Sequence, residues 1–166
     1  MKKIIILLII LSVSTRSYSQ YKLAQGEKQI NAGVGFSDWG IPVFVGMDFG
    51  VHQDISLGGE VSFRSYYERW EHHSYHHSVL GVFANGNYHF NTVLKIPTTW
   101  DLYAGLNIGF YAWSNPDNYY RDRVSGLGLG IQLGGRYYFN DNVGVNLEIG
   151  GGNSFNGGKL GISYKF

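Results

Sequence analysis

The sequence of 166 residues contains no cysteine and only three prolines. Without cysteine, the chain has neither a disulfide scaffold nor a lipid-modified N-terminal cysteine. Basic residues are not in surplus and acidic residues form no long run, so the composition indicates neither nucleic acid as a partner nor a disordered acidic tail. We also expect no cofactor.

A long apolar run is missing too, because the N-terminal stretch Ile4–Val13 is shorter than the roughly 20 residues of a membrane-spanning helix. Two lysines precede it, and Ser17 and Ser19 occupy positions −3 and −1 before a cleavage site, as an export signal requires. We therefore predict a signal peptide over residues 1–19 and one mature domain over residues 20–166.

Glycine and aromatic residues are abundant in the chain. Glycine occurs 24 times, and phenylalanine, tryptophan and tyrosine together make up 16% of the sequence. Collagen would need a glycine period and a disordered chain would need few aromatics, so neither class fits. Without residues 1–19, twelve acidic residues face ten basic ones, and the remaining chain is long enough for a single domain.

Apolar residues alternate with polar residues or glycine in eight segments of the mature chain. In the first segment, Ile30, Ala32, Val34 and Phe36 share one face. A period of two that is sustained over about eight to fourteen residues predicts strands rather than helices. The predicted strands cover residues 28–36, 42–51, 55–65, 80–90, 100–113, 127–139, 143–150 and 159–166.

Charged residues gather on the glycine-rich face of these segments, and the apolar runs of the other face are free of charge. A soluble barrel or sandwich of this length could not bury so much apolar face. The pattern instead predicts an all-β fold, an eight-stranded antiparallel transmembrane β-barrel with its apolar face in lipid and a polar, Gly-rich lumen. The predicted inward charges are Asp48, Glu60, Arg64, Asp101, Arg136, Glu148, Lys159 and Lys165.

Short and long connections alternate between the predicted strands. Tight turns are expected near residues 52–54 and 140–142, with a somewhat longer connection over residues 91–99. Outer-membrane barrels have short periplasmic turns and long extracellular loops, which places both termini on the periplasmic side. Aromatic residues at the strand ends predict two interfacial belts. The turn-side belt would contain Phe49, Tyr88, Phe90, Trp100, Tyr137, Phe139 and Phe166, and the loop-side belt Trp39, Phe63, Tyr66, Trp70, Tyr111 and Trp113.

The last eight residues resemble the C-terminal assembly signal of bacterial outer-membrane barrels, with Lys159, Gly161, Tyr164 and Phe166 at its polar, glycine and aromatic positions. The mature chain resembles the family of small outer-membrane β-barrel domains that includes OmpX and the membrane domain of OmpA. Its cleavage region also resembles signals from Bacteroidetes. The resemblance implies a location in the cell outer membrane, contact with outer-membrane lipid and lipopolysaccharide, and insertion by the barrel-assembly machinery.

Four of the six histidines, His72, His73, His76 and His77, lie within six consecutive positions of the second predicted external loop. In a helix they would form two i, i+4 pairs, a spacing that binds zinc, nickel or copper, whereas in a strand alternate histidines would share a face. A solvated loop without metal is the simpler alternative. Histidines with an ordinary pKa of about 6.5 could also make this loop respond to pH.

Two alternatives stay open at this point, an enzyme that acts on lipid A and a small-solute channel. His72-x-Ser74 and His76-x-Ser78 have the spelling of a pair used by barrel enzymes that deacylate lipid A, although no carboxylate follows Ser78 before Asp101. Ion pairs of Arg64 with Glu60 and of Arg136 with Glu148 would satisfy charge inside the lumen, and a small-solute channel is the other interpretation of those charges.

The predicted loops are rich in tyrosine, tryptophan and arginine, the residue types that dominate binding hot spots. We therefore expect a non-enzymatic outer-membrane protein with a structural or surface-binding role, which contacts an extracellular ligand through its external loops.

Overall fold

The computed structural model describes residues 23–37, 40–70, 73–114 and 124–166, and among these the side chains of residues 66–70 and 73–76 are not described. The predicted signal peptide, residues 1–19, lies outside the described residues and stays a prediction.

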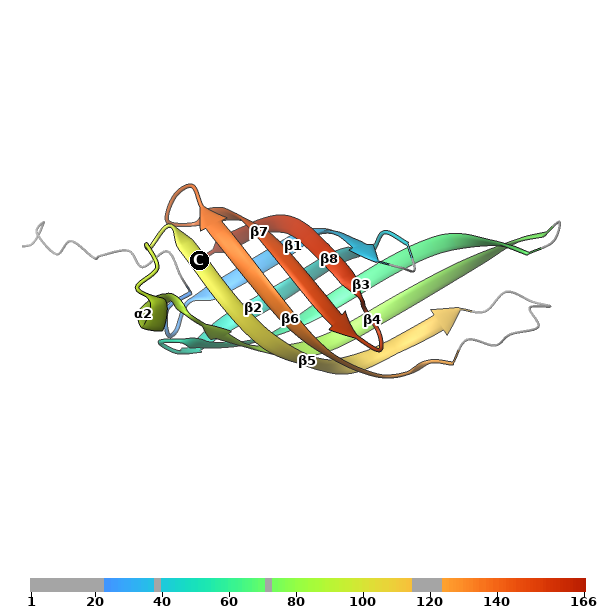
Figure 1. Cartoon of the computed structure of the whole chain (residues 1–166), viewed down its shortest axis with the longest axis horizontal. Helices are drawn as coiled ribbons and strands as arrows, with labels where there is room; N and C mark the ends of the chain where they lie inside the picture. The colour runs from blue at the N-terminus through green and yellow to red at the C-terminus, as the bar shows by residue number, and fades with distance from the viewer. Residues whose placement is uncertain (1–22, 38–39, 71–72, 115–123) are drawn as a thin grey trace, which may run out of the picture.

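Eight antiparallel strands form one closed barrel in which every strand pairs with its neighbours in the chain and β1 pairs with β8. This up-and-down arrangement confirms the fold predicted from the alternation (Figure 1). The strands are β1 (Lys28–Ser37), β2 (Val43–His52), β3 (Ile55–Trp70), β4 (His73–His89), β5 (Trp100–Ser114), β6 (Gly126–Tyr138), β7 (Val143–Gly152) and β8 (Gly157–Lys165).

The barrel has its polar residues inside and its apolar residues outside. Gln29 and Asp101 have no exposed surface, whereas Leu106 is 67% exposed and Ile131 is 64% exposed. In each strand the outward positions carry mainly Val, Ile, Leu or aromatic side chains. Such an arrangement is unfavourable in water and favourable in a bilayer, because the apolar face then contacts acyl chains and the closed ladder leaves no backbone edge unpaired.

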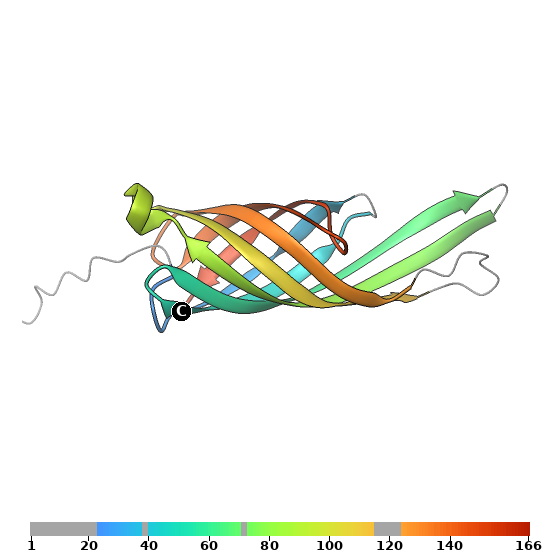
Figure 2. The same cartoon turned by 60° about the horizontal axis from the view of Figure 1, so that its bottom comes forward.

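The two ends of the barrel differ in length and shape. Strands β3, β4 and β5 contain 16, 17 and 15 residues, whereas β1, β2 and β7 contain 10 and β8 contains 9. As a result the β3–β4 hairpin extends well beyond the rest of the wall at one end (Figure 2). By the short-turn rule this is the extracellular end.

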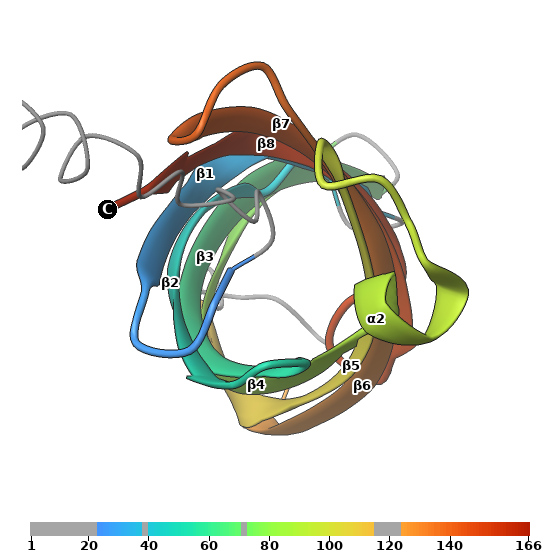
Figure 3. The ribbon, with the colours of Figure 1, turned by 90° about the vertical axis from the view of Figure 1, so that its left-hand side faces the viewer.

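The opposite, periplasmic end carries the predicted tight turns between β2 and β3 and between β6 and β7. The longer connection between β4 and β5 contains a helical turn, α2 (Asn91–Leu94), which the alternation did not predict. Seen along the barrel axis, α2 and the segment after it lie at the wall and bulge outward from the ring of strands (Figure 3). In the described part of the chain, no helix has the length and apolar character needed to cross a membrane.

Aromatic side chains cluster on the outer surface of the periplasmic end, where the turn-side belt was predicted. The Tyr88 and Phe90 rings lie 5.3 Å apart, Trp100 and Tyr137 4.9 Å, and Tyr137 and Phe139 5.5 Å. This turn-side belt is therefore present.

The loop-side belt differs from its prediction. Tyr111 and Trp113 fall on the inward face of β5, in register with Asp101 and Tyr103, and the Trp113 ring lies 6.4 Å from the buried His77 ring. Phe63 is exposed on the outer face as expected. Trp39 lies outside the described residues, and the side chains of Tyr66 and Trp70 are not described.

Candidate functional site: an external hairpin above a filled lumen

The half of the lumen nearer the periplasmic end is organised around one arginine. Arg136 Nη2 lies 2.7 Å from Asp48 Oδ2 and Arg136 Nη1 lies 3.1 Å from Asp101 Oδ2, and all three side chains are almost fully buried. The guanidinium carbon also lies 4.2 Å from the centre of the Tyr103 ring. Strands β2, β5 and β6 are thereby joined across the interior, and the guanidinium compensates two carboxylates that would be costly to bury alone.

Asp101 continues into a buried hydrogen-bonded relay. His89 Nδ1 lies 2.7 Å from Asp101 Oδ1, and His89 Nε2 lies 2.9 Å from Ser56 Oγ. The order serine, histidine, aspartate is that of a hydrolase triad. None of the three has exposed surface and Asp101 is shared with Arg136, so no path for a substrate reaches Ser56, and the relay satisfies buried polar groups.

The half of the lumen nearer the extracellular end is organised around one lysine. Lys159 Nζ lies 2.7 Å from Glu60 Oε1 and 3.2 Å from Glu148 Oε1. The Tyr103 hydroxyl donates to Glu148 over 2.9 Å and so connects this layer to the arginine layer below. The eight charged residues predicted to point into the lumen do so, but the predicted pairing is wrong: neither Arg64 with Glu60 nor Arg136 with Glu148 is an ion pair.

Arg64 instead contacts the loop between β7 and β8. Its Nη2 atom donates to the Ser154 carbonyl over 2.5 Å, and Phe155 from the same loop lies with its ring centre 5.2 Å from Lys159 Nζ. Between the two charged layers and this loop, the lumen retains a cavity of about 60 Å³. That volume holds only a few water molecules, so the polar side chains fill the lumen rather than line a pore.

Above this filled lumen the β3–β4 hairpin continues as a two-stranded ladder. Its register runs from Tyr66 opposite His77 to Trp70 opposite His73, whereas the described pairing of β4 with β5 runs only as far as Ser78 opposite Ser114, the last described residue of β5. Residues predicted as a loop are therefore extended strand. The helical i, i+4 arrangement of histidines does not occur in the part of β4 that the structure describes.

The four histidines of the predicted metal site are placed unequally. His72 lies outside the described residues, and His73 and His76 belong to β4 with side chains that are not described. His77 is fully buried on the inward side of β4, next to Trp113. Among the described residues, no three His, Cys, Asp or Glu side chains form a group that could hold a metal ion. The metal site at His72, His73, His76 and His77 thus stays a prediction.

The residues of the predicted assembly signal divide between the two faces of β8. Lys159 points into the lumen, and a Cβ atom on Gly161 would lie 2.5 Å from the Ala32 carbonyl oxygen of β1. Tyr164 and Phe166 are exposed on the outside, with stacked rings 6.3 Å apart. These positions have clear structural roles, and their role as a signal stays a prediction.

No family model and no curated protein sequence matches the chain. Solved structures match it over most of its length. The outer membrane protein OprG from Pseudomonas aeruginosa is 11% identical with a TM-score of 0.64, over 88% of this chain and 98% of that one. The N-terminal β-barrel domain of P. aeruginosa OprF is 17% identical with a TM-score of 0.59, over 86% and 98%. The Yersinia pestis outer membrane protein Ail is 15% identical with a TM-score of 0.57, over 86% and 100%.

These similarities concern the fold, which is that of small outer-membrane β-barrels. Combined with the apolar outer face and the turn-side aromatic belt, the fold identifies an outer-membrane barrel. Its lumen is occupied by ion pairs, and its most extended feature is the external hairpin.

Proposed function

We propose that this barrel is a non-enzymatic surface protein that binds an extracellular ligand through the β3–β4 hairpin, with the barrel as a rigid support. The observation that carries the proposal is the ladder from Tyr66 opposite His77 to Trp70 opposite His73, which continues beyond the described pairing of β4 with β5. A paired, extended hairpin presents its residues at a fixed distance from the membrane, whereas an unstructured loop would have to be ordered on binding.

The composition of the hairpin supports recognition. Residues 66–76 include three tyrosines, one tryptophan and one arginine, which are the residue types enriched at binding hot spots. Ail, which has the same fold, has been solved in complex with the heparin analogue sucrose octasulfate. A sulfated glycan is therefore a reasonable first probe for the present hairpin.

The test is binding of the barrel in nanodiscs to a glycan array that includes heparin. A variant in which residues 67–76 are replaced by Asn-Gly removes the hairpin tip, and Val124→Ala serves as a control at the same end of the barrel. We expect the intact protein and the control to bind at least one glycan class that the shortened variant does not bind. Equal binding by all three proteins, or none by any, would contradict the proposal.

A channel is disfavoured by the filled lumen. The Arg136 and Lys159 layers span the interior, and the remaining cavity has a volume of only about 60 Å³. We expect planar-bilayer recordings of the intact protein to show no discrete conductance steps. Steps of uniform size that change when Arg136 or Lys159 is substituted would favour transport instead.

The histidines of the hairpin are a separate proposal for the same region, namely weak binding of zinc, nickel or copper. Titration calorimetry of the folded protein in detergent tests it, with a variant that carries His72, His73, His76 and His77 as alanine. Micromolar binding that is lost in the variant would support a metal site, and equal heats from both proteins would exclude one.

Export and assembly complete the proposal. We infer that residues 1–19 are removed on export and that Lys159, Gly161, Tyr164 and Phe166 are recognised by the barrel-assembly machinery, with lipopolysaccharide around the outer half of the barrel. N-terminal sequencing of the membrane-inserted protein should begin at Gln20. Deletion of Phe166 should lower the inserted fraction in cells while purified protein still folds in detergent.

A further inference from the structure

The β4–β5 connection exposes aliphatic side chains at the periplasmic end of the barrel. Val93 is 65% exposed and Leu94 is 62% exposed, and Lys95 next to them is exposed as well. The neighbouring turn between β2 and β3 has Gln53 and Asp54 at its tip, and the turn between β6 and β7 is equally polar apart from Phe139. Exposed aliphatics at a membrane-protein turn are costly in water, so their surroundings need an explanation.

The backbone holds these side chains in a fixed direction. Buried Asn91 donates to the Trp100 carbonyl over 2.5 Å and accepts from the Leu102 N–H over 3.2 Å, which ties the start of α2 to β5. The Thr92 hydroxyl donates to Asp54 in the β2–β3 turn. With Asn91 and Thr92 engaged on the barrel, Val93 and Leu94 remain exposed.

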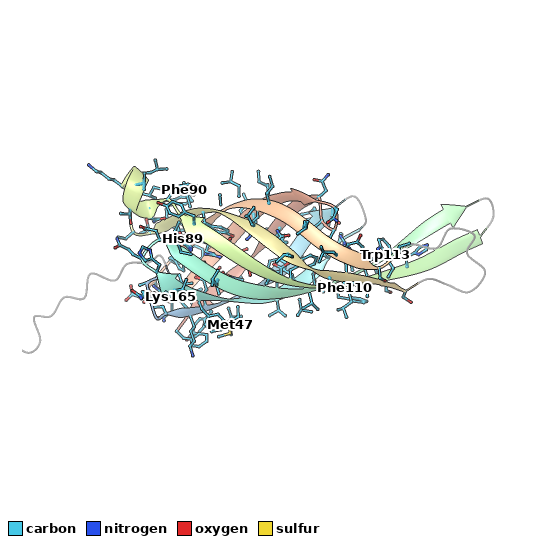
Figure 4. All side chains as sticks on the ribbon, turned by 90° about the horizontal axis from the view of Figure 1, so that it is seen from below. Met47, His89, Phe90, Phe110, Trp113 and Lys165 are labelled. Atoms are coloured by element: carbon cyan, nitrogen blue, oxygen red, sulfur yellow. The ribbon has the colours of Figure 1, made fainter. Side chains whose placement is uncertain are left out.

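The β4–β5 connection that carries these side chains lies at the wall of the barrel and not across its opening. In the end view the connection bulges outward from the ring of strands, and in the side view from below it stands at the outer edge of the barrel beside Phe90 (Figures 3 and 4). The Phe90 ring lies 5.3 Å from Tyr88, and Trp100 at the far end of the connection lies 4.9 Å from Tyr137. Both ends of the connection thus belong to the turn-side aromatic belt, and the exposed aliphatics continue that lipid-facing surface.

Lys95 provides an independent observation. Its φ of 51° and ψ of 43° place it in the left-handed region at the end of α2, and it is the one residue other than glycine with a positive φ in the described part of the chain. Glycine or asparagine is favoured at such a position because a Cβ atom is strained there. The left-handed backbone ends α2 at this residue, and the exposed Lys95 side chain directly follows Val93 and Leu94.

We propose that the turn Val93–Lys95 is a binding site for inner-leaflet phospholipid. Val93 and Leu94 insert among the upper acyl carbons beside the aromatic belt, and the Lys95 ammonium binds the phosphate of an anionic headgroup. Lysine and aliphatic side chains at one interfacial turn have the composition of membrane-surface anchors. The proposal depends on the outer-membrane location and is independent of the ligand of the external hairpin.

The chain has no cysteine, so single-cysteine variants can be labelled at one position. We would attach an environment-sensitive nitrobenzoxadiazole dye to Leu94→Cys and, as a matched control, to Asp141→Cys in the polar β6–β7 turn at the same end. The proteins would be placed in phosphatidylcholine nanodiscs containing lipid with a nitroxide near the headgroup end of the acyl chain. We expect several-fold stronger quenching at position 94 than at position 141. Equally weak quenching at both positions, as for a turn that docks on a periplasmic protein, would overturn the proposal.

The headgroup contact has its own control. Lys95→Gly removes the ammonium while glycine adopts the same backbone conformation without strain. In nanodiscs of equal parts phosphatidylcholine and phosphatidylglycerol, nitroxide-labelled phosphatidylglycerol should quench the dye at position 94 more than labelled phosphatidylcholine does. This preference should disappear in the Lys95→Gly background. A preference that survives the substitution, or one that is absent from the start, would overturn the role of Lys95.

Discussion

At the scale of single residues, the folded state depends on charges that compensate each other inside a narrow lumen. Arg136 lies between Asp48 and Asp101, at 2.7 Å and 3.1 Å. Replacing it with methionine would remove the guanidinium that both buried carboxylates share, leaving Asp101 with His89 and Asp48 with the amides of Asn31 and Asn85. We expect Arg136→Met to lower the free energy of unfolding by about 3–5 kcal/mol, measured by urea titration in phospholipid vesicles.

The rescue variant separates charge from packing. Adding Asp48→Asn and Asp101→Asn to Arg136→Met removes the uncompensated carboxylates but leaves the shape of the lumen similar, so most of the lost stability should return. If the triple variant is as unstable as the single one, the guanidinium stabilises the barrel through its contact with the Tyr103 ring and not through charge compensation.

Glycines of the lumen make space for large inward side chains, and adjacent positions in β6 test this. A Cβ atom on inward Gly134 would lie 2.3 Å from the Tyr103 ring, whereas on outward Gly135 it would lie no closer than 3.1 Å to the end of Leu102. We expect Gly134→Ala to cost about 1–3 kcal/mol, as other overpacking substitutions do, and Gly135→Ala to cost clearly less in the same urea titration. A larger loss at Gly135 would contradict this packing of Tyr103.

At the scale of elements, the β3–β4 hairpin beyond Ser78 pairs with no third strand in the described part of the chain. Replacing residues 67–76 with Asn-Gly therefore removes a ladder with which no other described strand pairs. We expect the free energy of unfolding in vesicles to change by no more than about 0.5 kcal/mol. A large loss of stability would show that the hairpin is needed for the barrel to form and would weaken its assignment as a surface for recognition.

The strands themselves were predictable because the inward and outward faces differ so strongly in polarity. Alternation located all eight strands, and the register then sent Asp48, Glu60, Asp101, Arg136, Glu148 and Lys159 into the lumen as expected. The strand ends were less predictable. In the stretch 66–70 the sequence mixes aromatic and charged residues without an apolar–polar alternation, so the pattern that marks a strand in lipid is lost although the ladder continues.

Ion-pair partners were not predictable from the sequence. Arg136 and Asp48 are 88 residues apart in the chain and meet across the lumen, as do Lys159 and Glu60 at a separation of 99. Which charges reach the same height depends on strand tilt and on the stagger of the whole closed sheet. The ion pair predicted from the sequence for Arg64 with Glu60 joined two residues of one strand and took no account of that stagger. The helical turn α2 was missed for a different reason, since four residues are too few to show a period.

At the scale of the whole molecule, stability depends on the solvent on each side of the wall. Leu106 lies near the middle of β5 and is 67% exposed, an exposure that would make it tolerant of a charge in a soluble protein. In the outer membrane the same position faces acyl chains. We expect Leu106→Lys to lower the free energy of unfolding in vesicles by about 2–4 kcal/mol, because a lysine at the bilayer midplane loses its hydration.

Val124 is the matched control for this substitution. It is 78% exposed and precedes β6 at the extracellular end, outside the strands, where an added charge remains in water. Val124→Lys should therefore change the unfolding free energy by no more than about 0.5 kcal/mol. Because the two side chains are similarly exposed and both become lysine, the cost of taking the charge out of water should dominate the difference between the two variants. Equal and small effects at both positions would mean that the apolar outer face of the barrel does not contact lipid.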